Sequence, residues 1–174
     1  VKGIAVLLES VGKLVAAGRN VRLTVAGDGA LREDLERRAA SLGDAVRFVG
    51  YRSQPEIRQH LAESDALVLP SFAEGVPVSL MEAMSQERAV VATSVGGVTE
   101  LVKHGVNGLV VHPGDPIALA DALTTLADDP ELRRTMGLAG RETVRADFDS
   151  ATEARRLVAL FRDPEGTRGM VRPD

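Results

Sequence analysis

The sequence predicts an α/β fold in which helices cover both faces of a mostly parallel sheet. Short apolar runs, each the length of a buried strand, alternate along the chain with segments whose apolar residues recur at helical spacing. Hydrophobic residues make up 44% of the chain and aromatic residues only 3%, so the core must be aliphatic. At 174 residues the chain has the length of one domain.

Helices and strands alternate through the first two thirds of the chain. One helical face is formed by Ile4, Leu7, Leu8, Val11, Leu14 and Val15, and Gly18 suits the end of that helix. The pattern then predicts, in order, a strand at 21–26, a turn at 27–29, a helix at 31–39, a strand at 46–49, a helix at 54–63, a strand at 66–69, a helix from 77, a strand at 90–93, a helix at 98–104 and a strand at 107–111.

After Pro113 the sequence predicts helices alone. Asp115-Pro116 and Asp129-Pro130 each place a capping aspartate before a proline suited to the first helical turn. We expect helices at 116–127, 130–146 and 148–162. Residues 1–162 are therefore expected to form the domain, and residues 163–174, rich in Pro, Gly and charge, a disordered tail.

Composition excludes several classes of function. The net charge is −4 with both signs scattered, so no basic patch indicates nucleic acid. Cysteine is absent, and the three histidines lack metal-ligand spacing, so no metal site is expected. No apolar run approaches the ~20 residues of a membrane helix, and no signal peptide is visible. These features favour a soluble, cytoplasmic protein.

The rest of the chain is organised around residues 70–84, which follow the predicted strand at 66–69. Pro77 suits the first position of a helix. Glu74 would then lie in the loop and Glu82 in the helix, with seven residues between them. The amides of Val78 and Ser79 are expected to be unpaired, which makes a phosphate-binding shape. Ionised carboxylates beside it act only as acceptors, as sugar hydroxyls require.

This pattern resembles the E-x7-E motif of retaining glycosyltransferases with the GT-B fold, where it lies in the C-terminal, donor-binding domain. The next segments strengthen the resemblance: residues 90–93 with 96–100 resemble the following strand and glycine turn, and residues 105–111 the one after that. The series runs from Lys2-Gly3 to about Phe148. It is most similar to family 4, especially the bacterial enzymes that build extracellular polysaccharide.

The resemblance implies a Rossmann-like, doubly wound sheet and a nucleoside diphosphate sugar as substrate, UDP- or GDP-linked, with no cofactor. It implies that Glu82 bonds the ribose hydroxyls, that Glu74 faces the donor sugar, and that Lys2 contacts the diphosphate. A cation there would offset charge on the leaving nucleotide. The further residues implied at the donor are Gly75, Val76, Val78, Ser79, Gly96 and Gly97, with Val49 and Gly50 at the base edge.

Each of these residues also has a structural interpretation. Glu82 can be a solvated helix residue, Glu74 a loop carboxylate and Lys2 a terminal lysine. Gly96 and Gly97 can serve close backbone approach or a positive φ. Glu100 is better interpreted as a first-turn helix acid than as a ligand.

The sequence departs from the family in three places. The strand that usually precedes the Lys-Gly pair is missing, which in a 3-2-1-4-5-6 order would split the sheet between residues 21–26 and 66–69. Pro77, where the family often has glycine, removes an amide donor. Glu87 stands where a family glycine ends the helix in the left-handed conformation, which costs a non-glycine residue about 1 kcal/mol.

By resemblance, the intact enzyme would transfer a sugar to a saccharide or lipid-linked acceptor, which would bind through a missing N-terminal domain. Peripheral membrane association of that enzyme stays open. The alternatives are a nucleotide-sugar epimerase of the same architecture and a non-catalytic nucleotide-sugar binding module. Base, sugar and acceptor leave no trace in the side chains.

Overall fold

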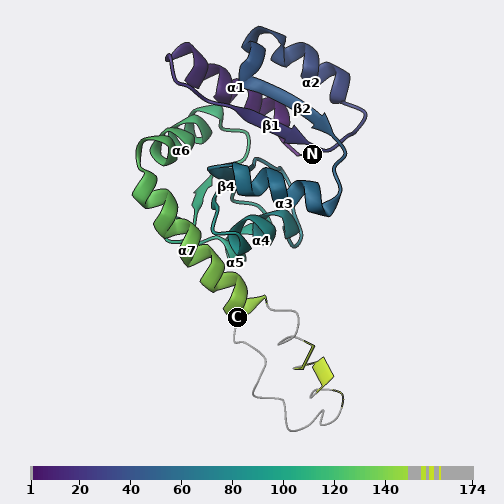
Figure 1. The fold of residues 1–174 in the computed structure, drawn as a ribbon, viewed down its shortest axis with the longest axis vertical. Coiled ribbons are helices and arrows are strands. Elements are labelled where there is room, and N and C mark those ends of the chain that lie inside the picture. The colour runs from purple at the N-terminus through teal and green to yellow at the C-terminus, as the bar shows by residue number, and fades with distance from the viewer. Residues whose placement is uncertain (1, 149–153, 156, 159–160, 162–174) are drawn as a thin grey trace.

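The computed structural model describes residues 2–148, 154–155, 157–158 and 161, and Figure 1 shows helices and strands alternating along the chain. The elements, in order, are α1 Ile4–Ala16, β1 Leu23–Ala26, α2 Arg32–Ala39, the 3-10 helix η1 Ala40–Ala45, β2 Val46–Gly50, α3 Gln54–Glu63, β3 Ala66–Leu69, α4 Val78–Ser85, β4 Ala89–Thr93, α5 Val98–Leu101, β5 Leu109–Val111, α6 Pro116–Asp128 and α7 Pro130–Asp147. The tail predicted at 163–174 lies outside the described residues, as does most of the helix predicted at 148–162.

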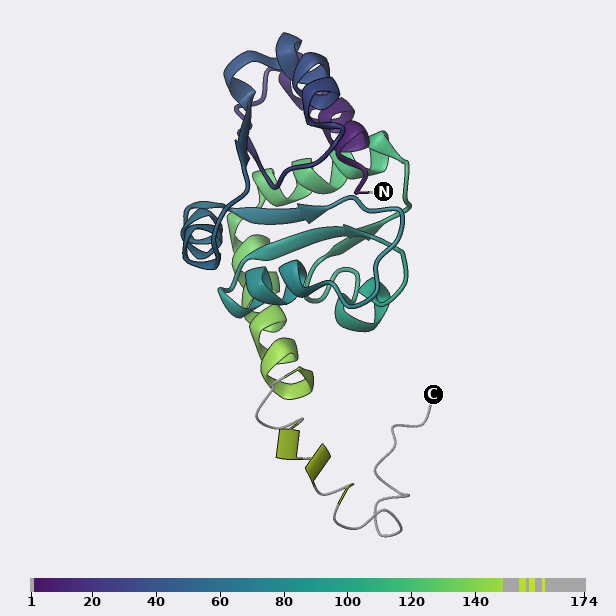
Figure 2. The same ribbon diagram turned by 90° about the vertical axis from the view of Figure 1, so that its right-hand side faces the viewer.

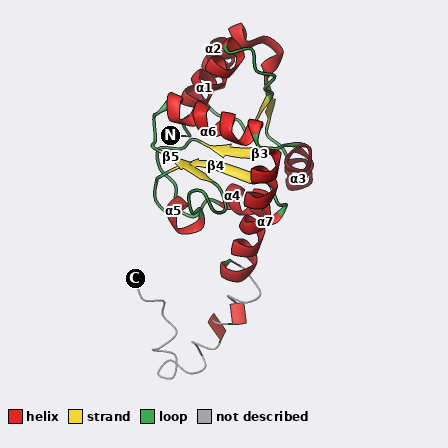
Figure 3. Ribbon diagram, turned by 90° about the vertical axis from the view of Figure 1, so that its left-hand side faces the viewer, coloured by secondary structure: helices red, strands yellow, loops and turns green. Residues whose placement is uncertain are grey.

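The strands form two separate parallel sheets. One has the order β1-β2 and the other β3-β4-β5. Within the described residues no strand pairing joins β1 to β3, which confirms the predicted split between these two segments. Figures 2 and 3 show the three-stranded sheet flanked by helices, with the β1–β2 pair, α1 and α2 forming a layer beside it. The Rossmann-like α/β class is confirmed.

Strand β4 lies at the centre of the core, and all five of its residues are buried. Its side chains alternate between the two faces of the sheet, as a strand requires. Ala89 and Val91 belong to the apolar cluster formed with α1, α6 and α7. Val90 and Ala92 belong to the cluster formed with α3, α4 and α5. Helices therefore cover both faces of this sheet, and its carboxyl edge is left to the loops.

Two predicted boundaries are wrong for one reason, the buried side chain of Asn107. The helix expected over 98–104 ends at Leu101, and the strand expected from 107 begins at Leu109. Asn107 is 1% exposed; its Nδ2 donates to the carbonyl of Leu101 (3.1 Å), and its Oδ1 accepts from the amide of Lys103 (2.7 Å). The amide side chain thus supplies the backbone partners that helix or strand would otherwise provide.

The end of α4 follows the sequence prediction. Glu87 has a φ of 58°, the only positive φ of a non-glycine residue in the described part of the chain. Its carboxylate pairs with Arg141 of α7. The turn therefore adopts the conformation for which the family uses glycine, with a glutamate in its place.

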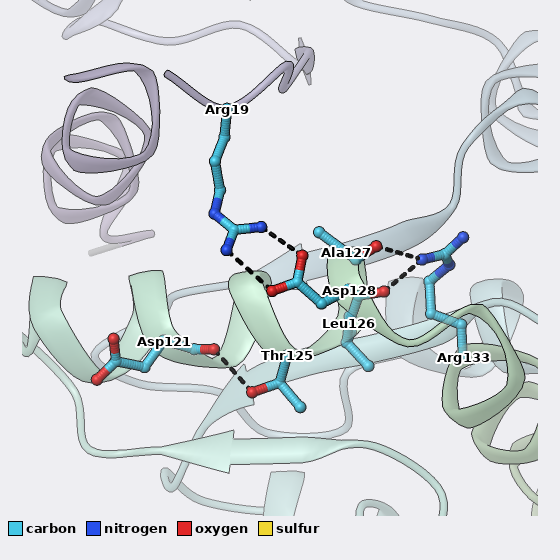
Figure 4. A network of polar contacts seen from close by, with 7 residues as sticks. All are labelled: Arg19, Asp121, Thr125, Leu126, Ala127, Asp128 and Arg133. Atoms are coloured by element: carbon cyan, nitrogen blue, oxygen red, sulfur yellow. Dashed lines mark hydrogen bonds and ion pairs between the residues drawn. The ribbon is translucent and has the colours of Figure 1, made fainter. Parts of the chain in front are cut away.

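A polar network attaches the β1–β2 layer to α6, as Figure 4 shows. The two terminal guanidinium nitrogens of Arg19, which precedes β1, donate to the carboxylate of Asp128 at the end of α6. Arg133 donates to the carbonyls of Leu126 and Ala127, which the end of α6 leaves without helical partners. In the part of the chain that the structure describes, no helix combines the length and apolar character needed to cross a membrane.

Candidate functional site

The candidate site lies where β3 and β4 end, in the loop from residue 70 to residue 77 that carries Glu74. Pro70, Ser71 and Pro77 in this loop are buried, whereas Phe72, Val76 and Val78 are exposed. The buried residues of the loop need hydrogen-bond partners for their polar groups, and Ser71 takes part in two such hydrogen bonds. Its hydroxyl donates to Glu74 Oε1, and its carbonyl accepts from Thr93 Oγ1 at the end of β4.

Lys2 and Glu74 form an ion pair, with 2.8 Å between Lys2 Nζ and Glu74 Oε1. The lysine side chain is 65% exposed and the glutamate side chain 11%. Burial acts to raise the pKa of the Glu74 carboxyl, but the hydrogen bonds from Lys2 and Ser71 outweigh it and hold that pKa below its ordinary value. Glu74 is therefore a carboxylate at neutral pH, with one cation beside it.

Gly96 and Gly97 lie directly against the Glu74 loop. Gly96 has a φ of 47°, and a Cβ built on it would be 1.9 Å from the carbonyl oxygen of Glu74. A Cβ on Gly97 would be 2.4 Å from the carbonyl oxygen of Gly75. Gly3, next to Lys2, approaches the carbonyl oxygen of Pro70 in the same way, at 1.8 Å. Glycine is needed for these approaches, and two segments distant in sequence, residues 2–3 and 96–97, meet at this loop.

The start of α4 corrects part of the sequence prediction. Pro77 is the N-cap, and the helix begins one residue later, at Val78. The Val78 amide is paired: it donates to the carbonyl of Val76 (3.0 Å), and this hydrogen bond closes a tight turn around Pro77. Ser79 keeps an amide without a hydrogen-bond acceptor among the described residues. One of the two expected free amides is therefore present.

Glu82 lies in the second turn of α4 and is half-buried. No hydrogen bond or ion pair of its carboxylate is formed with any described residue. Its carboxylate therefore keeps its full capacity to accept hydrogen bonds, which two adjacent hydroxyls of a ribose would use.

Val49 and Gly50 end β2, in the other sheet. The Gly50 carbonyl accepts from the amide of Gly27 (2.8 Å), and a Cβ built on Gly50 would lie 2.8 Å from Nη1 of Arg32. No hydrogen bond or ion pair of the described residues joins this pair to the Glu74 loop. The structure thus brings Lys2, Glu74, Gly75, Gly96 and Gly97 together, whereas Val49 and Gly50 end a strand of the other sheet.

Sequence reasoning did not select Ser71, Thr93 or Arg32. Ser71 could have been noticed because it precedes Glu74 by three residues, a spacing at which a serine side chain in a turn reaches an acceptor. Thr93 and Arg32 carry no such local pattern. Among the described residues, no group of three or more His, Cys, Asp and Glu side chains is arranged to hold a metal ion.

Comparison with known proteins identifies the family of the chain. Residues 1–129 match the family of glycosyl transferases group 1. The α-D-kanosaminyltransferase of Streptomyces kanamyceticus is 33% identical over 164 residues, which cover 93% of this chain and 42% of the relative. The amylovoran biosynthesis glycosyltransferase AmsK of Erwinia amylovora is 34% identical over 168 residues, 92% of this chain and 41% of the relative. The chain thus spans less than half the length of these relatives.

Solved structures show the same fold. Sucrose-phosphate synthase from Thermosynechococcus elongatus superimposes with a TM-score of 0.81 at 29% identity, over 95% of this chain and 43% of that protein. Anabaena HepE, solved in complex with UDP-glucose, gives a TM-score of 0.80 at 28% identity, over 93% and 45%. The C-terminal domain of the group 1 glycosyl transferase LpcC from Francisella tularensis gives 0.76 at 26% identity, over 86% and 80%. The chain belongs to the glycosyl transferases group 1 family and has the fold of the C-terminal domain of GT-B glycosyltransferases.

Proposed function

We propose that this chain is the donor-binding half of a retaining glycosyltransferase, which transfers a sugar from a nucleoside diphosphate sugar to a saccharide or lipid-linked acceptor. The observation that carries the proposal is the meeting of Lys2, Glu74 and the Gly96-Gly97 turn at the carboxyl ends of β3 and β4. Ligands of open parallel sheets bind at this edge. The complexes of HepE with UDP and with UDP-glucose support a donor of the same class.

The proposed roles are those that the family resemblance implies, and the charge and exposure of the three side chains are compatible with them. Lys2 is exposed enough to turn from Glu74 toward a diphosphate, whose charge grows as the sugar departs. Glu74, mostly buried, accepts a hydroxyl of the donor sugar through its carboxylate. Glu82, whose carboxylate has no partner among the described residues, accepts the ribose hydroxyls. Orienting the donor and stabilising the departing diphosphate are the whole contribution of this domain, and the acceptor is bound elsewhere in the intact enzyme.

Substitutions of the two glutamates should have different effects on the binding of UDP and of UDP-glucose. Glu82→Gln should weaken both UDP and UDP-glucose about ten-fold, because a hydrogen bond to a charged group contributes roughly 1.5–3 kcal/mol. Glu74→Gln should leave UDP nearly unchanged and weaken only UDP-glucose. GDP and GDP-mannose provide the second pair of probes, since the side chains do not indicate which base the donor carries.

Isothermal titration of the wild type and both variants with each probe measures these effects. Glu100→Gln is the matched control, because Glu100 is an exposed acid in the helix that follows Gly97 and has no proposed ligand. A wild type that binds none of the four probes would refute the donor-binding proposal. Equal losses of UDP and UDP-glucose in Glu74→Gln would refute the assignment of Glu74 to the sugar.

A further inference from the structure

Two buried hydroxyl side chains form a chain of hydrogen bonds that ends on Glu74. Ser71 has 0% of its surface exposed, and its Oγ donates to Glu74 Oε1 over 2.5 Å. Thr93 is 2% exposed, and its Oγ1 donates to the carbonyl of Ser71 over 2.5 Å. The chain therefore runs from the last residue of β4, through the loop after β3, to the carboxylate at the site.

The two oxygens of the Glu74 carboxylate are not equivalent. Oε1 accepts from both Ser71 and Lys2. Within the described part of the chain, no hydrogen bond or ion pair is formed by Oε2. One oxygen is thus held and the other is free to accept a hydrogen bond from a ligand.

The two donors to Oε1 differ in how firmly they are held. The Lys2 side chain is 65% exposed and sits on a flexible stem, so its amine can exchange Glu74 for a phosphate or for water. The Ser71 hydroxyl is buried and has Glu74 as its acceptor. A buried donor that loses its acceptor bears the cost of desolvation without compensation, so this bond persists when Lys2 leaves.

We propose that Ser71 and Thr93 are positioning residues for Glu74. Thr93 fixes the loop through the Ser71 carbonyl, and Ser71 fixes Oε1, so that Oε2 is presented to a hydroxyl of the donor sugar while Lys2 moves to the diphosphate. The second half of this inference rests on the proposed function. The first half, the anchoring of Oε1, concerns the protein without ligand.

The anchor can be tested without any ligand. The Glu74 carboxyl is titrated by carbon-detected NMR in the wild type, in Ser71→Ala and in Ser10→Ala. Ser10 is the matched control, because it is equally buried and donates to the carbonyl of Val6 in α1, away from Glu74. Loss of a donor to the carboxylate should raise the Glu74 pKa in Ser71→Ala alone. An unchanged Glu74 pKa in Ser71→Ala would overturn the anchor.

The presentation of Oε2 is tested by ligand discrimination, with UDP and UDP-glucose as probes. Ser71→Ala should weaken UDP-glucose about ten-fold, the effect of one hydrogen bond to a charged group, and leave UDP unchanged. Thr93→Val should have a smaller effect of the same kind, and Thr93→Ser, which keeps the hydroxyl, should restore wild-type discrimination. Adding Ser71→Ala to Glu74→Ala should cause no further loss, because the serine acts through the glutamate.

These measurements distinguish a positioning role of Ser71 and Thr93 from a role in stabilising the fold alone. Thermal unfolding of each variant checks that it is folded. Equal weakening of UDP and UDP-glucose in Ser71→Ala, or an undiminished effect of that change in the Glu74→Ala background, would overturn the positioning role. A wild type that binds neither UDP-glucose nor GDP-mannose would refute the proposed function and the sugar-facing role with it, whereas the NMR titration would still decide the anchor.

Discussion

Replacing Gly96 by alanine should lower the unfolding free energy by more than the backbone conformational cost of a non-glycine residue at this position, because the added Cβ also collides with the Glu74 loop. A non-glycine residue in the left-handed region costs about 1–2 kcal/mol. At Gly96 the added Cβ would also lie 1.9 Å from the Glu74 carbonyl oxygen, so the loop must move. Overpacking against a rigid partner costs about 1–3 kcal/mol. The expected total is about 2–5 kcal/mol of unfolding free energy.

Gly105→Ala is the matched control. Gly105 has a φ of 78° and no atom within 4 Å of an added Cβ, so this variant bears the conformational cost alone. Urea unfolding of both variants gives the difference, and titration with UDP-glucose shows whether the moved loop has displaced Glu74. We expect Gly96→Ala to lose more stability, more UDP-glucose affinity, or both. Equal effects of the two changes on stability and on binding would refute the close approach as the reason for glycine at 96.

Three further predictions concern the whole chain. Binding of UDP-glucose should survive EDTA, because Lys2 provides the cation for the diphosphate; loss of binding on chelation would contradict this. The chain expressed alone should self-associate, since β1 and β3 each have an edge that is unpaired among the described strands and can pair with another chain. A stable, monodisperse monomer in light scattering would refute this prediction. The lowered Glu74 pKa contributes stability that is present above the unfolded glutamate pKa and lost as pH falls through the folded value. The urea midpoints of wild type and Glu74→Gln should therefore converge as the pH falls below the unfolded glutamate pKa of roughly 4.3, and a difference that stays constant with pH would contradict this prediction.

The sequence predicted helices and strands correctly where local sequence signals determine their bounds. The helix predicted at 54–63 matches α3, at whose start the Ser53 amide and hydroxyl donate to the Glu56 carboxylate, and β3 lies at the predicted residues 66–69. The segment around Asn107 was misjudged because a polar residue in an apolar stretch gives no sign that its side chain will replace backbone partners. The boundaries on either side of Asn107 failed because they are set by hydrogen bonds between its side chain and the nearby backbone.

The site was predicted as a set of residues but not as a set of contacts. The family resemblance placed Glu74, Gly96 and Gly97 at the donor, and in the structure they meet beyond the carboxyl ends of β3 and β4. It assigned Lys2 to the diphosphate and Glu74 to the sugar, and gave no indication that the two would pair with each other across 72 residues. The amide of Val78 was misjudged because the turn back to Val76 depends on the loop conformation.

The separation of the two sheets has a consequence for amide hydrogen exchange. Strands β1 and β2 pair only with each other among the described strands. They are attached to the rest of the domain by the partly buried side chains of Leu23 and Val46, which pack against the apolar cluster of α1 and α6, and by exposed polar contacts such as Arg19 with Asp128. Two paired strands have little stability of their own. Their amides should therefore exchange through a partial opening that leaves β3, β4 and the Glu74 loop protected, as an independent cooperative unit. The edge expected to contact the base would then fluctuate while the phosphate and sugar side stays formed.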